Sequence, residues 1–179
     1  MTFLLSSSED HTQAHGAALA SAIFGFKKKQ RAAEPFLIQL IGEVGAGKTA
    51  FCRGFINQWM RLYDSSVDAP IQSPTFNLAR VYGDLDQGLA GDQAVAHLDL
   101  YRLHSQEELN QIGFEKYFYE TPVCLVEWLE QIPRFKDLYP TDWISVAISF
   151  DEAELLKRKL EFSGPPHMAV TLEFIKSGL

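Results

Sequence analysis

One stretch decides the fold of this chain: Gly42-Glu43-Val44-Gly45-Ala46-Gly47-Lys48-Thr49. It follows the pattern G-x-x-x-x-G-K-T. The glycines allow the backbone to turn tightly and to approach an anion without a Cβ in the way, and successive N–H groups then form a concave anion site. In this pattern the lysine reaches the β- and γ-phosphates of a nucleotide, and the threonine hydroxyl takes one position on Mg²⁺. The stretch therefore predicts a phosphate-binding loop (P-loop).

The segments on both sides of the loop have the character that the motif requires. Phe36–Ile41 is a short apolar run, typical of a buried strand. Lys48–Leu62 carries apolar residues at helical spacing and contains no proline, and the start of such a helix adds its dipole to an anion site. The alternative is a glycine-rich turn that merely joins a strand to a helix. We predict a site for a nucleoside triphosphate with Mg²⁺, contacted by Glu43, Val44, Gly45, Ala46, Gly47, Lys48 and Thr49.

The composition is that of one globular domain. The 179 residues are 46% apolar and 22% charged, which is ordinary for a soluble protein, and this length suits a single core, so we expect one domain over residues 1–179. The net charge of −7 argues against direct binding of nucleic acid, because neutralising phosphates requires a basic face. The basic cluster at 27–31 is interpreted as a solvated loop, with a contact surface as the alternative.

The cysteines and the start of the chain indicate the compartment. Cys52 and Cys124 lack metal-ligand spacing and are expected to be buried free thiols. No apolar segment is long enough to span a bilayer, and the N-terminus lacks a basic region ahead of an apolar core, so no secretory signal is predicted. We therefore expect a cytoplasmic location.

The pattern of the remaining elements predicts an α/β fold. Helical spacing or capping signals predict helices at 12–24, 105–112 and 114–118, and alternating or apolar runs predict strands at 4–5, 78–82, 95–101, 123–128, 143–150, 157–162 and 168–174. Residues 83–93 are rich in Gly and Asp and are interpreted as a long hairpin connection. We predict a single-domain P-loop NTPase fold whose central sheet is mostly parallel, with added antiparallel strands.

Two strand-end carboxylates are candidates for the second half of the site. Hydrolysis needs a carboxylate near Mg²⁺ and a way to place water. The apolar run before Glu127 is uninterrupted, so Glu127 is predicted to be the metal-side acid, and Asp99 is left to orient or deprotonate the attacking water. The alternatives are that Glu127 is an ordinary strand-end acid and that Asp99 pairs with Arg102. His97 is interpreted as a satisfied strand histidine.

A threonine lies where nucleotide-sensing loops sit in related NTPases. Thr75 follows the P-loop helix and precedes the next strand, so its hydroxyl is expected to reach Mg²⁺ or the γ-phosphate. The alternative is a cap or turn hydroxyl. The guanine-specificity signature Asn-Lys-x-Asp is absent from the sequence, which favours ATP.

Further motifs occur in a fixed order along the chain. They are Arg53-Gly54, Ser73-Pro74-Thr75-Phe76, His97-Leu98-Asp99-Leu100-Tyr101-Arg102-Leu103, Glu107-Glu108-Leu109, Ile112-Gly113 and Val126-Glu127-Trp128. Together with the P-loop, this set resembles the TsaE (YjeE) family in order and spacing. The members of this family are small bacterial P-loop ATPases of the tRNA threonylcarbamoyladenosine biosynthesis machinery. The resemblance runs from about residue 4 to about residue 150.

The resemblance implies an activity, partners and residue roles. It implies an Mg²⁺-dependent ATPase, weak alone, that acts with TsaD and TsaB, meets tRNA only through that complex, and does not itself carry the threonylcarbamoyl group. It also implies that Lys48 serves phosphate binding and hydrolysis, that Asp99 and Thr75 serve hydrolysis, and that Thr49 and Glu127 hold Mg²⁺. The residues implied to border the base are Glu9, Thr12 and Arg158.

The sequence departs from the family pattern in three places. The family usually has Asp after the first P-loop glycine, whereas this chain has Glu43; the connection at 83–93 is longer; and the C-terminal region matches weakly. Two other functions stay open. A P-loop small-molecule kinase would need a lid with several arginines, and a nucleotide-gated binding module would show negligible turnover.

Overall fold

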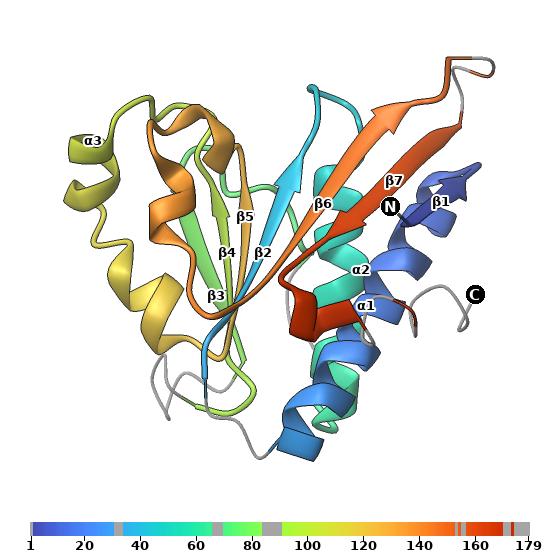
Figure 1. Cartoon of the computed structure of the whole chain (residues 1–179), viewed down its shortest axis with the longest axis horizontal. Coiled ribbons are helices and arrows are strands. Elements are labelled where there is room, and N and C mark those ends of the chain that lie inside the picture. The colour runs from blue at the N-terminus through green and yellow to red at the C-terminus, as the bar shows by residue number, and fades with distance from the viewer. Residues whose placement is uncertain are drawn as a thin grey trace.

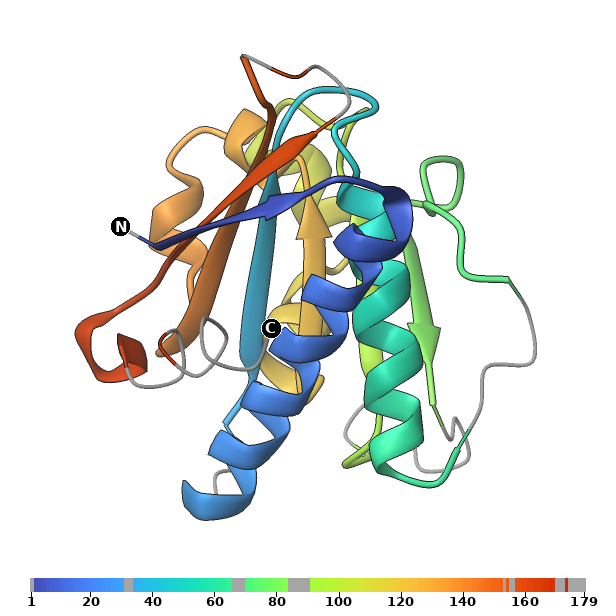
Figure 2. The same cartoon turned by 90° about the vertical axis from the view of Figure 1, so that its right-hand side faces the viewer.

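A twisted central sheet with helices on both faces forms the molecule (Figure 1). The structure is a computed structural model that describes residues 2–30, 34–65, 70–83, 91–152, 154, 157–169 and 173. Helices α1 (Glu9–Gln30) and α2 (Lys48–Leu62) lie side by side on one face (Figure 2). The other face is covered by α3 (Gln106–Gln111), the π-helical turn η2 (Lys116–Glu120) and the 3₁₀ turns η3 (Leu129–Gln131) and η4 (Phe135–Leu138).

The sheet has seven strands in the order β1-β7-β6-β2-β5-β4-β3. The four inner strands β6, β2, β5 and β4 are parallel, and antiparallel strands extend the sheet on both sides. The prediction of a mostly parallel sheet with added antiparallel strands is confirmed. In chain order the strands are β1 (Thr2–Ser6), β2 (Phe36–Ile41), β3 (Ala79–Tyr82), β4 (Val95–Asp99), β5 (Val123–Glu127), β6 (Asp142–Phe150) and β7 (Arg158–Ser163).

The inner strands are buried on both faces, which explains their continuous apolar runs. Alternate residues enter different clusters: Val95 and Leu125 join the core beneath α1 and α2, whereas Leu98 and Val126 join the core beneath α3. Asp99 is in register with Glu127 in the neighbouring strand. The two carboxylates therefore leave the sheet on the same face, the one that α2 covers.

Helices α1 and α2 approach each other closely through two glycines. A Cβ added to Gly16 would lie 2.2 Å from the carbonyl oxygen of Phe51, and one added to Gly54 would lie 1.9 Å from that of Gln13. Both distances are far inside van der Waals contact with backbone atoms. This crossing sets the start of α1 beside the P-loop.

The first helix is longer than the predicted 12–24. The Ser8 hydroxyl caps it by accepting the His11 N–H at 3.1 Å, and Glu9 and Asp10 in the first turn and three lysines in the last turn complement the helix dipole. The glycine at position 25 does not end the helix, because an interior glycine costs only about 1 kcal/mol relative to alanine. The basic cluster at 27–31 was predicted to be a loop. This prediction is wrong for residues 27–30, which belong to α1, and residue 31 lies outside the described residues.

The last predicted strand, at 168–174, is wrong where the structure describes it. Met168 ends the 3₁₀ turn η5 (Pro166–Met168), and Ala169 and Glu173 are helical. Proline is favoured at the first helical position because its φ is already fixed. The other residues of that segment lie outside the described residues. The predicted hairpin at 83–93 is confirmed in its pairing, since β3 and β4 are antiparallel neighbours, although residues 84–90 are outside the described part.

Candidate nucleotide site

The P-loop joins the end of β2 to the start of α2 and depends on glycine conformations. Gly47 has φ 110° and directly precedes α2, a left-handed conformation that favours glycine. Gly42 has φ 152°, and a Cβ there would lie 2.3 Å from the carbonyl oxygen of Ile148 in β6. The glycine at position 47 thus allows the loop to turn, and the glycine at position 42 allows the loop to pack closely against β6.

The ammonium group of Lys48 is folded into the loop. Its Nζ donates hydrogen bonds to the carbonyl oxygens of Gly42 (2.6 Å) and Glu43 (3.0 Å) and lies 3.8 Å from the centre of the Trp128 ring. Burial lowers the pKa of Lys48, and the nearby Glu127 carboxylate opposes that shift. The positive charge is thus held over the loop in a partly desolvated place, where an anion would be attracted more strongly than in water.

The two residues predicted to hold Mg²⁺ are in direct contact. Thr49, in the first turn of α2, donates its hydroxyl to Oε1 of Glu127 at 3.2 Å. The same oxygen lies 2.9 Å from Nε2 of His97 and 3.9 Å from Sγ of Cys52. Glu127 is only 2% exposed. A hydroxyl and a carboxylate are hard oxygen ligands, which Mg²⁺ prefers, so this pair fits the metal.

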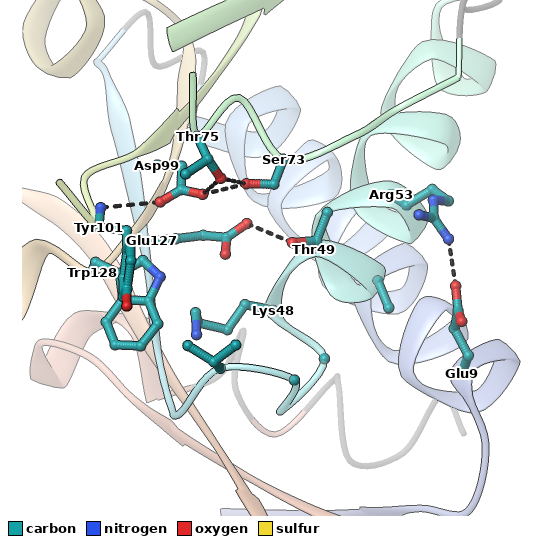
Figure 3. A pocket seen from close by; sticks show the side chains of 14 residues that line it. Glu9, Lys48, Thr49, Arg53, Ser73, Thr75, Asp99, Tyr101, Glu127 and Trp128 are labelled. Atoms are coloured by element: carbon teal, nitrogen blue, oxygen red, sulfur yellow. Dashed lines mark hydrogen bonds and ion pairs between the residues drawn. The ribbon is translucent and has the colours of Figure 1, made fainter. Parts of the chain in front are cut away.

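Asp99 is held by the loop that contains Thr75. Its Oδ2 accepts hydrogen bonds from the hydroxyls of Ser73 and Thr75, and its Oδ1 accepts the Tyr101 N–H at 3.1 Å (Figure 3). Arg102 instead places its guanidinium 5.2 Å from the centre of the exposed Phe76 ring. The alternative pairing of Asp99 with Arg102 is therefore not the arrangement found here.

A cavity of about 510 Å³ connects these groups. In Figure 3 the side chains of Lys48, Thr49 and Glu127 lie toward its centre, with Asp99 and Thr75 on one side. The cavity is lined by Glu9, Val44, Gly45, Gly47, Lys48, Thr49, Ala50, Arg53, Ser73, Thr75, Asp99, Tyr101, Glu127 and Trp128. The structure therefore brings together every residue predicted for metal binding and hydrolysis.

The residues implied to border the base surround a second, smaller cavity. This space of about 170 Å³ is lined by Ser8, Glu9, Thr12, Gly45, Ala46, Gly47, Ala50 and Arg158. Arg158 donates from Nε to the carbonyl oxygen of Ala46 at 3.2 Å and lies over the Phe150 ring. Glu9 lines both cavities and forms an ion pair with Arg53. Glu43, the departure from the family pattern, lies in the P-loop but does not line either cavity.

Sequence reasoning missed two neighbours of the site. Trp128 takes a left-handed conformation with φ 68° and covers Lys48, and nothing in its residue type signals that conformation. His97, interpreted as a satisfied strand histidine, lies in β4 and is partnered through Nε2 by Glu127, whereas its Nδ1 has no partner among the described residues; the contact with the predicted metal-side acid was not foreseen. Its signal was available: His97 and Asp99 are two residues apart in one strand, so both face α2.

The sequence profile of the family described as "Threonylcarbamoyl adenosine biosynthesis protein TsaE" matches residues 6–160. This chain belongs to the TsaE family. The crystal structure of Bacillus subtilis YdiB is similar to it in fold, with a TM-score of 0.66 at 21% identity over 99% of this chain and 95% of that one. The family predicted from the motifs is confirmed.

Curated TsaE proteins are similar over the middle of the chain. That of Rickettsia conorii is 40% identical over 96 residues, which are 54% of this chain and 48% of the relative. That of Bacillus subtilis is 33% identical over 102 residues, which are 55% and 56%. The chain thus matches about half the length of these relatives. None of the helices in the described part of the chain combines the length and the hydropathy that a bilayer span requires.

Proposed function

We propose that this TsaE family member hydrolyses ATP with Mg²⁺. The observation that carries the proposal is the meeting of three parts at one end of the sheet: the P-loop, the Thr49–Glu127 pair, and Asp99 in register on the next strand. Phosphoryl transfer is catalysed mostly by positioning and charge stabilisation, and these parts supply both. A bound Mg²⁺ would neutralise charge on the phosphates, with Thr49 and Glu127 as its protein ligands.

Lys48 and the loop amides are proposed to bind the phosphates. The Lys48 ammonium now donates to two backbone carbonyl oxygens, which are neutral acceptors. Hydrogen bonds to charged acceptors are roughly twice as strong. We therefore expect the ammonium to leave these carbonyls for phosphate oxygens, without a change in the fold of the loop.

Asp99 is proposed to orient the attacking water. The carboxylate is 3% exposed, and the Ser73 and Thr75 hydroxyls and the Tyr101 N–H fix its direction. Thr75 also lines the cavity, so its hydroxyl has two possible partners. In this structure it donates to Asp99, and with nucleotide bound it could contact the phosphate or the metal instead. A switch between them would couple the Ser73–Leu78 loop to the nucleotide.

The proposed biological role is in tRNA threonylcarbamoyladenosine formation. We infer that the chain supplies ATP hydrolysis to TsaD-type and TsaB-type partners and does not transfer the threonylcarbamoyl group itself. The family match supports this role. The kinase alternative is disfavoured because the one guanidinium lining the larger cavity, among the described residues, is Arg53, and it is ion-paired with Glu9. No arginine clamp for a transferring phosphoryl group is present there.

The test is ATP turnover with and without TsaD-type and TsaB-type proteins, at several Mg²⁺ concentrations. Glu127→Gln is expected to weaken Mg²⁺ dependence and to reduce turnover more than ATP affinity, because the amide keeps shape but loses charge. The matched control is Glu130→Gln: this neighbouring carboxylate accepts from Gln39 at 3.2 Å, and an amide oxygen can still accept there. Equal effects of both variants, or no turnover under any condition, would contradict the proposal.

A further inference from the structure

Behind the nucleotide cavity lies a cluster of three buried side chains of different chemistry. The potential ligand atoms of Cys52, His97 and Glu127 all lie within 4.8 Å of one another. Cys52 and His97 are fully buried, and Glu127 is nearly so. The cluster forms because Cys52 on α2 faces the side of the sheet from which His97 and Glu127 project. ATP hydrolysis as proposed above uses only Glu127 of these three.

The donor set differs from that expected for Mg²⁺. Sulfur, imidazole nitrogen and carboxylate oxygen together suit a borderline-soft cation such as Zn²⁺, whereas Mg²⁺ prefers oxygen alone. Tetrahedral Zn²⁺ with ordinary bond lengths separates its ligand atoms by about 3.3–3.6 Å. The His97–Glu127 and Cys52–Glu127 distances of 2.9 and 3.9 Å lie on either side of that range. Side-chain movements on the order of 1 Å would complete the set.

Binding of such a cation requires the cluster to change its protonation. Sulfur binds a metal as the thiolate, so the proton of the Cys52 thiol must leave. Binding would release this proton to solvent. Nε2 of His97 would bind the metal while Nδ1 carries the ring proton. Nδ1 has no hydrogen-bond partner among the described residues. Moving the ring proton from Nε2 to Nδ1 therefore breaks no hydrogen bond at Nδ1.

We propose that Cys52, His97 and Glu127 form a site for Zn²⁺ or a similar borderline-soft divalent cation, and that its occupation inhibits the nucleotide site. Three protein ligands leave a fourth position for water; Glu127 and its neighbour Thr49 line the larger cavity, from which water could reach it. The shared atom is Oε1 of Glu127: a cation that takes this oxygen removes it from Thr49 and Mg²⁺. The inhibitory part rests on the proposed ATPase function; the binding part does not.

The binding test uses Co²⁺ as a spectroscopic substitute for Zn²⁺ on the nucleotide-free full chain. A thiolate ligand gives a cobalt charge-transfer absorption in the near ultraviolet, which oxygen and nitrogen ligands do not give. This band is expected in the wild type and in Cys124→Ser, the matched control at the other buried cysteine. It should be absent in Cys52→Ser, and in Cys52→Ala as a second variant. Added Zn²⁺ should remove the band by displacing Co²⁺.

The affinity and activity tests separate this site from the Mg²⁺ site. Loss of an outer-shell partner alone weakens metal binding about 10- to 100-fold, so Cys52→Ser should weaken Zn²⁺ binding by at least about tenfold. Zn²⁺ should inhibit ATP turnover of the wild type and of Cys124→Ser at lower concentration than it inhibits Cys52→Ser.

The outcomes distinguish the two proposals. A wild type without the band, or a band that survives in both Cys52 variants, overturns the metal site whatever the turnover. Equal zinc inhibition of wild type and Cys52→Ser overturns the regulatory role. A clear band in a chain that never hydrolyses ATP supports the metal site and overturns only the proposed ATPase function.

Discussion

Replacing Gly54 by alanine tests whether the close approach of α1 and α2 is a structural requirement. The added Cβ would lie 1.9 Å from the carbonyl oxygen of Gln13 and 2.5 Å from its carbonyl carbon. These are backbone atoms in the second turn of α1, so no side-chain rotation relieves the clash. The helices must separate or one must shift along the other. We expect Gly54→Ala to destabilise the fold.

The magnitude follows from two opposing terms. Overpacking in a well-packed interior costs about 1–3 kcal/mol. Gly54→Ala is expected at the upper end of this range, because its Cβ would clash with backbone atoms, which cannot rotate away. Replacing an interior helical glycine by alanine returns about 1 kcal/mol. The net loss in free energy of unfolding is therefore about 1–2 kcal/mol. Gly25 is the matched control. It is likewise a glycine inside a helix, here α1 rather than α2, but its Cβ would meet no atom within 4 Å, so Gly25→Ala should stabilise by up to about 1 kcal/mol.

The assay is chemical denaturation of both variants, with ATP affinity measured alongside. Because the start of α1 carries Glu9 and Thr12 to the smaller cavity, Gly54→Ala should also weaken ATP binding, whereas Gly25→Ala should not. A Gly54→Ala protein that is stabilised as much as Gly25→Ala, with the same dependence on denaturant, would refute the reasoning about the helix crossing.

Three further changes test individual contacts. Lys48→Ala should keep the fold but weaken ATP binding by at least about tenfold, because it removes a charge-assisted contact; near-normal affinity by calorimetry would contradict the P-loop assignment. Thr75→Ala should uncouple partner assembly from ATP about five- to a hundredfold while leaving ADP binding nearly unchanged, and a pull-down of TsaD-type and TsaB-type proteins with ATP or ADP measures this; an identical nucleotide dependence would reduce Thr75 to a turn hydroxyl. Tyr139, whose hydroxyl donates to Gln39, has its pKa raised to about 12 by burial and by Glu130. Its contribution to stability is present below the unfolded pKa of about 10 and is lost as the pH rises through 12. Tyr139→Phe should therefore reduce the decrease in the free energy of unfolding between about pH 10 and pH 12, measured by chemical denaturation at each pH. The same decrease in the variant and the wild type would exclude Tyr139 as its source.

Much of the fold was predictable because its signals are local. The P-loop glycines, the uninterrupted run before Glu127 and the capping box at Ser105 and Glu108 each depend on a few adjacent residues, and the structure contains all three elements. The mostly parallel sheet follows from strands that are apolar along their whole length. The strand-end positions of Asp99 and Glu127 follow from the same runs.

The incorrect secondary-structure predictions concern segments whose structure depends on packing with distant residues, or whose pattern fits both a strand and a helix. The basic cluster at 27–31 was interpreted as a loop, but Phe24 and Phe26 pack against the core and α1 continues beyond them. The alternation at 168–174 fits a strand, yet Met168 and Leu172 are also four residues apart, a helical spacing. The contacts of Trp128 with Lys48 and of Cys52 with Glu127 depend on the placement of α2 over the sheet, which no short stretch encodes.

The register of β4 and β5 restricts where this chain can change length. Asp99 is paired with Glu127, and each strand alternates between the two cores. Inserting or deleting one residue inside either strand would reverse the face of every side chain beyond that point, sending a carboxylate into the apolar cluster under α3. A change of length in the 83–93 connection leaves that phase intact. Insertion scanning should therefore find that insertions are tolerated in this connection, whereas insertions a few residues later, within β4, abolish folding or ATP binding.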